Sequence, residues 1–264
     1  ARRSANSIAA WAQTFPGREL IVVLTGTDLY RDIRTDASAQ RSLELATQLV
    51  VLQEAGLEEL SPQHRAKTQV IYQSCPRAAP APKASHFTAL MVGHLRDEKD
   101  PLTYLRAAQR LKHRPGIALE HIGRDETNTY AQEMASTSQT NPQYHWLGGL
   151  AKDDTLARMA RSHVLVHCSK MEGGAHVILE AVQLGTPVIA SRISGNIGML
   201  GADYAGYFAL GDDAALAQMI ERAADDANFL RTLHSQCQVR AHLFEPSEEK
   251  RRVLDLLIPL KETL

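Results

Sequence analysis

Two glutamates and a glycine pair have the spacing of a site for a sugar or a nucleotide. Glu172 is followed directly by Gly173 and Gly174, and Glu180 comes eight residues after the first glutamate. Glycines let the backbone approach a ligand, and the free N–H groups of a helix start suit a diphosphate. Carboxylates accept hydrogen bonds from vicinal hydroxyls, and the offset spans roughly 12 Å of helix. The pattern fits one extended ligand; the alternative is a solvated Glu172, a Glu180 on a helix face and glycines that only form the turn.

The residues around this pattern predict a strand, a glycine loop, a helix and a second strand. Residues 164–167 form a short apolar run that is typical of a buried strand. Apolar residues then recur with helical spacing until Gly185 and Pro187, which end a helix. Residues 187–190 begin another buried strand. Such a unit belongs to a parallel sheet, and its chemistry lies in the first turn.

The segment from Glu172 to Glu180 resembles the signature of nucleotide-sugar-dependent, family-4-like glycosyltransferases of the GT-B fold. The resemblance implies that Glu172 contacts the donor sugar hydroxyls and that Glu180 holds the ribose hydroxyls. It also implies that backbone N–H groups of Gly173, Gly174 and Ala175 bind the sugar and the phosphates. The common motif is Glu-Gly-Phe-Gly, so Gly174 here replaces the aromatic residue and Ala175 the next glycine.

A cationic loop follows the predicted strand at residues 87–93. Arg96 and Lys99 would flank the same carboxyl edge as Gly173, where two cations stabilise the charge on a departing diphosphate. The alternative is surface pairing with the acidic residues of the same loop. In the resembling family an Arg and a Lys of this loop hold the diphosphate. Lys99 matches in register, whereas His94 stands at the usual Arg position, and we expect Arg96 to take that role. The predicted catalytic residues are thus Arg96, Lys99 and Glu172.

The strand predicted at residues 144–150 ends in another glycine pair. In related enzymes the backbone of the following loop binds the nucleotide base, so the resemblance makes Gly148, Gly149 and Leu150 candidates for the base site. Elsewhere, a helix is predicted from Asp125 to Met134, and a glycine-rich loop is predicted over residues 191–201.

The first part of the chain predicts a smaller parallel sheet. Its first strand, residues 20–24, is followed by Thr25, Gly26, Thr27 and Asp28. The segment after a strand's carboxyl end borders the ligand crevice, which favours a substrate-facing loop. Asp28 is either a ligand contact or a turn residue with a local hydrogen bond. The segment resembles the His-Gly-Thr-Asp of GT-B amino-terminal domains, with Thr25 replacing the His, so we assign no catalytic base.

Closely spaced prolines in residues 75–83 predict an extended linker. We expect residues 1–75 to form an acceptor-side Rossmann-like domain, residues 76–85 the linker and residues 86–245 a nucleotide-sugar-binding Rossmann-like domain. Residues 246–264 would form a helix that crosses back to the first domain. The fold class is therefore α/β, of the GT-B type with two parallel sheets. The resemblance implies that the amino-terminal domain is incomplete before Ala1.

Composition sets further limits. The 264 residues suffice for two modest α/β domains, and a net charge of −1 argues against a nucleic acid partner. No apolar run reaches the roughly 20 residues of a membrane span, and no signal peptide is recognisable. Cys75, Cys168 and Cys237 are far apart and indicate reduced thiols and a cytoplasmic location. No carboxylate cluster resembles a metal site, so we expect a metal-independent reaction with a UDP-sugar co-substrate and no cofactor.

Four segments together resemble the bacterial selenosugar synthases of selenoneine biosynthesis. They are residues 1–5, 24–33, 91–101 and 171–177. The resemblance implies that a UDP-sugar, such as UDP-N-acetylglucosamine, is joined to selenophosphate to give a 1-selenosugar. A small anionic acceptor would suit Arg2, Arg3 or Arg31, although for Arg2 and Arg3 ordinary surface arginines are the commoner explanation. The alternatives are a transferase with a hydroxyl acceptor and a nucleotide-sugar binding module without turnover.

Overall fold

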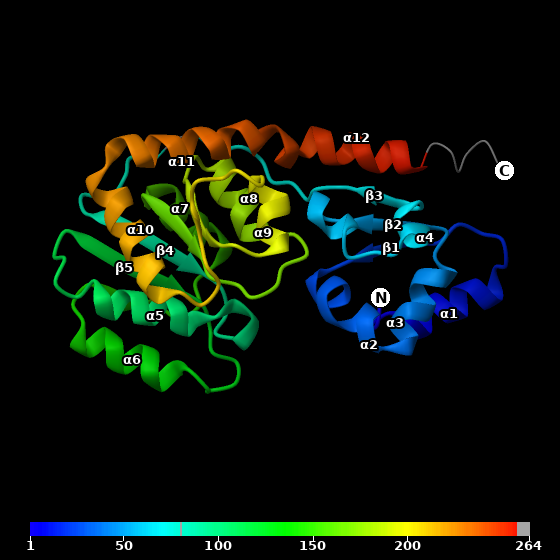
Figure 1. Ribbon diagram of the computed structural model, residues 1–264, viewed down its shortest axis with the longest axis horizontal. Helices are drawn as coiled ribbons and strands as arrows, with labels where there is room; N and C mark the ends of the chain where they lie inside the picture. Colours follow the sequence, from blue (N-terminus) through cyan, green and yellow to red (C-terminus); the bar gives the residue numbers. More distant parts are fainter. Residues whose placement is uncertain (80, 258–264) are drawn as a thin grey trace.

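Two parallel β-sheets organise the chain (Figure 1). A computed structural model describes residues 1–79 and 81–257. The smaller sheet has the strand order β1-β2-β3, and the larger has the order β6-β5-β4-β7-β8-β9. All of these strands pair in parallel. The predicted α/β class with two parallel sheets is confirmed.

The smaller sheet is formed by three short strands with helices between them. The strands are β1 (Ile21–Leu24), β2 (Gln48–Val51) and β3 (Thr68–Val70). The helices are α1 (Ala5–Thr14), the π-helix η1 (Asp28–Asp32), α2 (Ile33–Thr35), α3 (Ala37–Leu45), the 3₁₀-helix η2 (Glu54–Leu57) and α4 (Pro62–Arg65). A small apolar core, centred on the buried Leu24, Leu29 and Leu49, joins this sheet to its helices.

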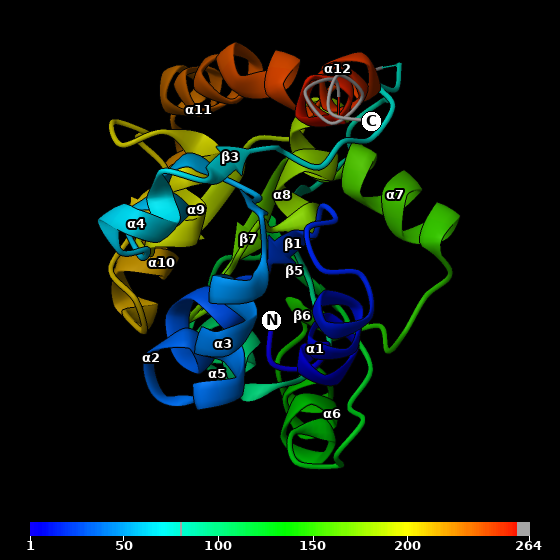
Figure 2. The same cartoon turned by 90° about the vertical axis from the view of Figure 1, so that its right-hand side faces the viewer.

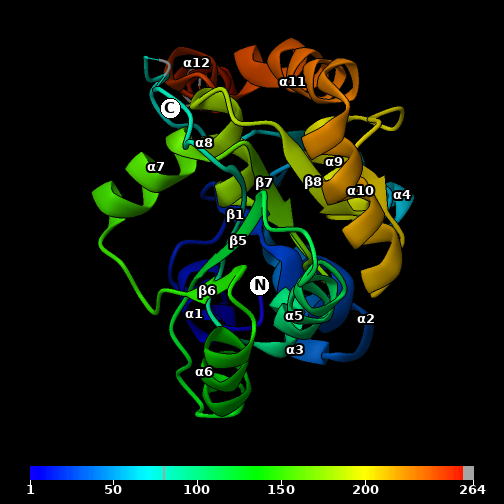
Figure 3. The same ribbon diagram turned by 90° about the vertical axis from the view of Figure 1, so that its left-hand side faces the viewer.

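The larger sheet has helices on both faces. Its strands are β4 (Phe87–Val92), β5 (Ile117–Ile122), β6 (Tyr144–Trp146), β7 (Val164–His167), β8 (Val188–Ser191) and β9 (Tyr207–Phe208). Its helices are η3 (Asp97–Lys99), α5 (Pro101–Arg110), α6 (Ala131–Thr140), α7 (Lys152–Arg161), α8 (His176–Gln183), α9 (Ser194–Leu200) and α10 (Asp213–Asp225). In Figure 3, α5 and α10 lie on one face of the sheet, and α7 and α8 lie on the other. Strands covered on both faces read as continuous apolar runs, as β7 and β8 do.

The strand order of the larger sheet reverses between β4 and β7. The chain adds β5 and β6 on one side of β4 and then returns to place β7 on the other side. Connections that leave β4 and β7 diverge to opposite faces, and in open α/β sheets the ligand crevice lies at the carboxyl ends of two such strands. The fold therefore brings the loop after residue 92 next to the turn after residue 167.

Three helices near the carboxyl end run along one side of the molecule (Figures 1 and 2). They are α11 (Ala227–Arg240), η4 (Ala241–Phe244) and α12 (Pro246–Leu257). Leu256 of α12 packs against Val50 and Ile71 of the smaller sheet. The rest of the predicted terminal segment, residues 258–264, lies outside the described residues. None of the described helices has both the length and the apolar character that crossing a membrane requires.

The segment between the sheets is extended but tied to the larger one. Cys75 N donates to Phe244 O, and Ala78 N donates to Gln183 O. The Lys83 ammonium donates to the carbonyl of Ala160, in α7, at 3.0 Å and to that of Ser162 at 2.7 Å. The segment is therefore fastened to the helices of the larger sheet at several points.

Two expectations about local structure were wrong. The helix predicted from Asp125 begins at Ala131, because the Asp125 carboxylate accepts hydrogen bonds from Tyr130 N and Ala131 N, both at 2.7 Å, and holds the preceding residues as a loop. The glycine-rich loop predicted over residues 191–201 contains helix α9. Its glycines do not mark flexibility: a Cβ on Gly195 would lie 2.0 Å from Glu172 O.

A buried hydroxyl connects the smaller sheet to two helices of the larger one. Tyr72, just after β3, donates from its hydroxyl to Gly198 O of α9 at 2.8 Å. Arg240 of α11 donates to the same hydroxyl at 2.9 Å. Since both partners lie beyond residue 190, this hydroxyl contributes to the contact between the two sheets.

We predict that Tyr72→Phe lowers the free energy of unfolding by about 1–2 kcal/mol, because Gly198 O and Arg240 each lose a buried partner. Urea unfolding measures the change. Tyr130→Phe is the matched control, because the Tyr130 hydroxyl has no hydrogen-bond partner within the part of the chain that the structure describes. Equal losses for the two variants would contradict the role assigned to the Tyr72 hydroxyl.

Candidate functional site

An ion pair lies where the strand order of the larger sheet reverses. Lys99, at the end of η3, donates to Oε1 of Glu172 at 2.5 Å. The Glu172 side chain is 12 % exposed and that of Lys99 is 32 % exposed. Two of the residues predicted for catalysis therefore meet at the crevice, and neither pairs with the acidic residues of the Lys99 loop.

A third side chain reaches the same carboxylate oxygen. His167, the last residue of β7, is 2 % exposed and places Nε2 3.2 Å from Glu172 Oε1. Burial by itself would raise the pKa of Glu172, but His167 and Lys99 outweigh it and lower that pKa to about 2. Glu172 is therefore ionised at neutral pH. Sequence reasoning missed His167; the available signal was a histidine that ends an otherwise apolar strand.

The second glutamate of the signature has partners of its own. Glu180 lies inside α8 and is buried. Its Oε1 accepts hydrogen bonds from Lys152 of α7 and pairs with His176 Nε2 at 3.0 Å. Burial raises the pKa of Glu180, but His176 and Lys152 lower it overall. Two separate carboxylates, each held ionised by a Lys and a His, thus flank the start of α8. Neither Lys152 nor His176 was predicted from the sequence as a site residue.

The glycine turn of the larger sheet lies directly against the smaller sheet. A Cβ on Gly26 would lie 2.6 Å from Gly173 N, and a Cβ on Gly173 would lie 2.3 Å from Gly26 N. A Cβ on Gly174 would lie 2.6 Å from Cβ of Leu52. Ala175, which follows, is buried at the start of α8. These glycines are required because two backbones approach closely, and Leu52 fills the space that an aromatic residue at position 174 would need.

The loop after β1 is closed by local hydrogen bonds. Thr25 donates from its backbone N and from Oγ1 to Oδ2 of Asp28, both at 2.9 Å. Of the two interpretations of Asp28, the turn residue is the one that these contacts match. Thr27 precedes the π-helix η1 and makes no side-chain cap there. Gly26 and the backbone of Thr25 are the parts of this loop that lie against the glycine turn of the larger sheet.

Two predicted arginines lie away from the ion pair. Arg96 donates to Glu126 at 2.6 Å, and both side chains are about half exposed. Arg3 is exposed and has no ion pair or side-chain hydrogen bond within residues 1–79 and 81–257. Its neighbour Arg2 donates to Asp32 at 2.8 Å instead. The structure thus brings Lys99, Glu172 and the glycine turn together, but not Arg96 or Arg3.

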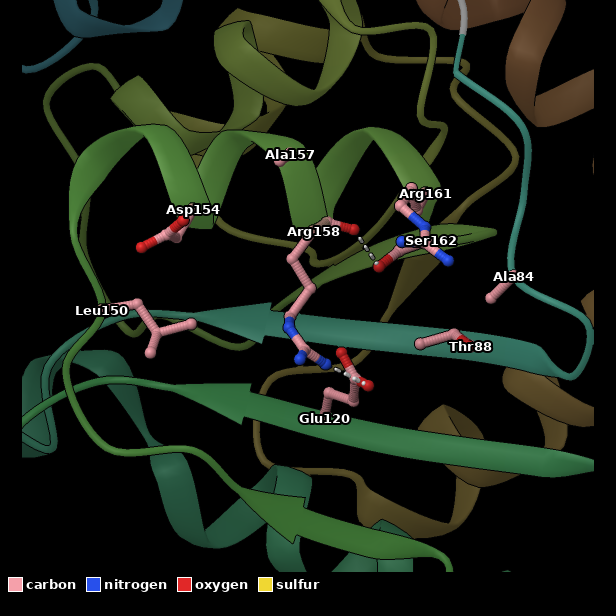
Figure 4. A pocket seen from close by; sticks show the side chains of 9 residues that line it. All are labelled: Ala84, Thr88, Glu120, Leu150, Asp154, Ala157, Arg158, Arg161 and Ser162. Atoms are coloured by element: carbon pink, nitrogen blue, oxygen red, sulfur yellow. Dashed lines mark hydrogen bonds and ion pairs between the residues drawn. The ribbon is translucent and has the colours of Figure 1, made fainter.

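The candidates for the base site follow β6. Gly148 has φ of +66° and accepts a hydrogen bond from Gly123 N at 2.8 Å. A Cβ on Gly149 would lie 2.3 Å from Cγ of Arg124, which covers this glycine. Leu150 lines a cavity that Figure 4 shows. These three residues lie along the sheet edge on the β5 side of the crevice.

That cavity, of about 440 Å³, lies between α7 and the face of the larger sheet (Figure 4). Its lining includes an ion pair from Arg158 to Glu120 at 2.6 Å. None of its lining residues comes from the loops after β4 and β7; they are Ala84, Thr88, Glu120, Leu150, Asp154, Ala157, Arg158, Arg161 and Ser162. Among the described residues, no three His, Cys, Asp or Glu side chains gather as a metal ligand set. The chemistry of the Lys99–Glu172 crevice, rather than cavity size, identifies it as the candidate site.

Comparisons with known proteins identify the family and the fold of the chain. The model of the family described as "Glycosyl transferases group 1" matches residues 77–238. HepE from Anabaena, solved with UDP and glucose, has a TM-score of 0.78 at 19% identity, over 96% of this chain and 75% of that chain. Sucrose-phosphate synthase from Thermosynechococcus elongatus has a TM-score of 0.77 at 17% identity, over 97% and 71%. The pneumococcal O-GlcNAc transferase GtfA, solved with UDP and GlcNAc, has a TM-score of 0.72 at 18% identity, over 96% and 55%. At these identities the likeness shows a shared fold, and the predicted GT-B fold is confirmed.

The pKa of Glu172 predicts how stability depends on pH. Its folded pKa of about 2 lies below the ordinary value of 4.5, so its stabilising contribution is present above pH 4.5 and is lost as the pH falls toward 2. The stability difference between wild type and Glu172→Gln should shrink by at most about 3 kcal/mol over that range. Urea unfolding at several pH values checks this. Glu44→Gln, in an exposed pair with Arg41, should show little such change. A difference for Glu172→Gln that does not vary with pH would contradict the assignment.

The contact between Gly174 and Leu52 predicts a compensating pair of substitutions. Gly174→Phe, which restores the common family residue, should lower the free energy of unfolding by about 1–3 kcal/mol, because Leu52 occupies the space. Adding Leu52→Gly should recover part of that loss. Gly116→Phe is the control, because nothing lies within 4 Å of a Cβ at Gly116. Losses that simply add in the double variant would show that the two positions are not in contact.

Proposed function

The chain belongs to the group 1 glycosyltransferases, and from that premise we propose that it transfers a sugar from UDP-N-acetylglucosamine to selenophosphate, giving a 1-selenosugar for selenoneine biosynthesis. The observation that supports a UDP-sugar donor is the ionised Glu172, which pairs with Lys99 where the strand order reverses. The acceptor half is supported by the four sequence segments that resemble the selenosugar synthases.

The charged groups and backbone amides around the crevice match the parts of such a donor. Its diphosphate would lie at Lys99 and the amino terminus of α8, where a positive charge and free N–H groups face it. Glu172 would accept hydrogen bonds from the sugar hydroxyls, and Glu180 from the ribose. Two of the solved structures with this fold contain UDP with a sugar, which supports a UDP-sugar as the donor.

A small anionic acceptor is supported by guanidinium groups on the side of the smaller sheet. Arg2 and Arg31 both pair with the buried Asp32, at 2.8 and 3.3 Å. Nη1 of Arg31 also lies 4.0 Å from Glu98, in the short helix that carries Lys99. A dianion that enters beside this helix would therefore meet positive charge from the smaller sheet and from the larger one.

Selenophosphate as the acceptor is also consistent with a loop after β1 that offers no catalytic base. The selenium lone pair would form the bond to C1 of the sugar, the bond between C1 and the β-phosphate oxygen would break, and UDP would leave with that electron pair. Lys99 and backbone amides would stabilise the departing charge without a metal ion. Water would then cleave the Se–P bond to release phosphate. A hydroxyl acceptor must lose a proton, whereas an anionic selenium nucleophile need not, and Thr25 offers no base there.

The test is a mass-spectrometric product screen of UDP-sugars with selenophosphate or with hydroxyl acceptors, with and without EDTA. We expect UDP and a 1-selenosugar from UDP-N-acetylglucosamine and selenophosphate, at a rate that EDTA does not change. Lys99→Ala and Glu172→Ala should each lower that rate about 100-fold or more, whereas Lys112→Ala, at an exposed position, should not. Glycosides of hydroxyl acceptors alone would overturn the acceptor. UDP-sugar binding without any turnover would overturn the reaction.

A further inference from the structure

We infer that His167 is a positioning residue: it keeps the Glu172 carboxylate charged and in place while Lys99 engages the donor diphosphate. This inference rests on the proposed use of a UDP-sugar donor, but it is independent of the acceptor. It starts from a buried polar atom that the packing of β7 does not explain.

The environment of His167 is unusual for the residue that ends a buried strand. The four residues of β7 are all buried, and the three that precede His167 in the strand are aliphatic. Nε2 of His167 is inaccessible to solvent and has no hydrogen-bond partner of good geometry among the described residues. It nevertheless lies 3.2 Å from Glu172 Oε1. A buried donor without a good hydrogen bond costs about 1–3 kcal/mol, so an aliphatic side chain would serve the strand better.

Lys99 and His167 both lie against Oε1 of Glu172, but they differ in mobility. Lys99 has a flexible stem and remains 32 % exposed, so its ammonium group can turn toward a ligand in the crevice. His167 is fixed on a central strand of the sheet and is buried. A diphosphate with its negative charges competes with Glu172 for the ammonium group. His167 has no such freedom and stays with the carboxylate.

Without His167, donor binding would leave the buried Glu172 carboxylate without a partner that offsets its negative charge. The loss of a partner leaves the full cost of the buried charge. On the side of the smaller sheet, the Glu172–Gly173 backbone meets Gly26 and the backbone of Thr25, neither of which carries a charge. As Lys99 turns to the phosphate, His167 can rotate slightly to donate a well-aligned hydrogen bond to Oε1. The other carboxylate oxygen is then free to accept from a sugar hydroxyl.

This role predicts different effects on the binding of the UDP-sugar and on the binding of UDP. Glu172 is proposed to touch the sugar, whereas Lys99 and the amides of α8 touch the diphosphate, which UDP alone also contains. Loss of His167 should therefore weaken binding of both ligands, because each draws Lys99 away from Glu172, and should weaken the UDP-sugar more, because only the sugar needs the Glu172 carboxylate in place. A purely structural role for His167 would weaken both ligands to the same extent, because both need the same loops.

The experiment measures Kd for UDP-N-acetylglucosamine and for UDP by calorimetry, together with KM and kcat, for wild type, His167→Leu and His167→Gln. For His167→Leu we expect the Kd of the UDP-sugar to rise about tenfold or more and the Kd of UDP to rise by a clearly smaller factor. His167→Gln, which retains an N–H donor, should recover much of the loss. His145→Leu, at an exposed histidine of β6, is the matched control, and thermal unfolding establishes that each variant is folded.

Two results would overturn the inference. The first is an unchanged Kd of the UDP-sugar in His167→Leu, and the second is an equal loss for UDP and the UDP-sugar in a folded variant. An error in the proposed function would appear in the wild-type chain rather than in the variants. A wild-type chain that binds no UDP-sugar refutes the donor, and with it the role of His167. A wild-type chain that binds the UDP-sugar but rejects selenophosphate refutes only the acceptor and leaves the role of His167 to be decided by the variants.

Discussion

The ion pair between Lys99 and Glu172 is the interaction on which the rest of the site depends. A parallel sheet whose strand order reverses between β4 and β7 places the ends of these two strands side by side. A carboxylate that is only 12 % exposed requires a compensating cation. Lys99 supplies it from the loop after β4, and this pairing sets the position of the glycine turn. The chemistry of the site thus follows from topology and from the cost of burying charge.

The two sheets approach each other closely where glycines, which have no side chain, lie at the contact. Gly26 and Gly173 meet backbone to backbone, and Leu52 fills the space beside Gly174. The same turn that would bind a donor is therefore the place where the smaller sheet packs against the larger one. A donor bound at this turn, as we propose, would require the two sheets to move apart, which would couple substrate binding to domain movement.

The sequence predicted the sheets and the position of Lys99 at the same carboxyl edge as the glycine turn, because strand ends and glycine turns leave a clear pattern of apolar and polar residues. It did not predict the partners that hold each carboxylate. His167 belongs to an apolar strand and Lys152 to a surface helix, and their meeting with the glutamates depends on side-chain direction, which a linear pattern does not contain. The two local errors have a related cause: Asp125 satisfies backbone N–H groups of a loop, and Gly195 is needed for close packing rather than for a flexible turn.

The most direct measurement is a crystal structure of the chain with a UDP-sugar. We predict that the nucleotide lies across the carboxyl ends of β4 and β7, with the Lys99 ammonium on the diphosphate. In that complex Glu172 would contact the sugar and still lie against Nε2 of His167. A nucleotide in the cavity between α7 and the sheet face, or a bound sugar out of reach of Glu172, would contradict the account.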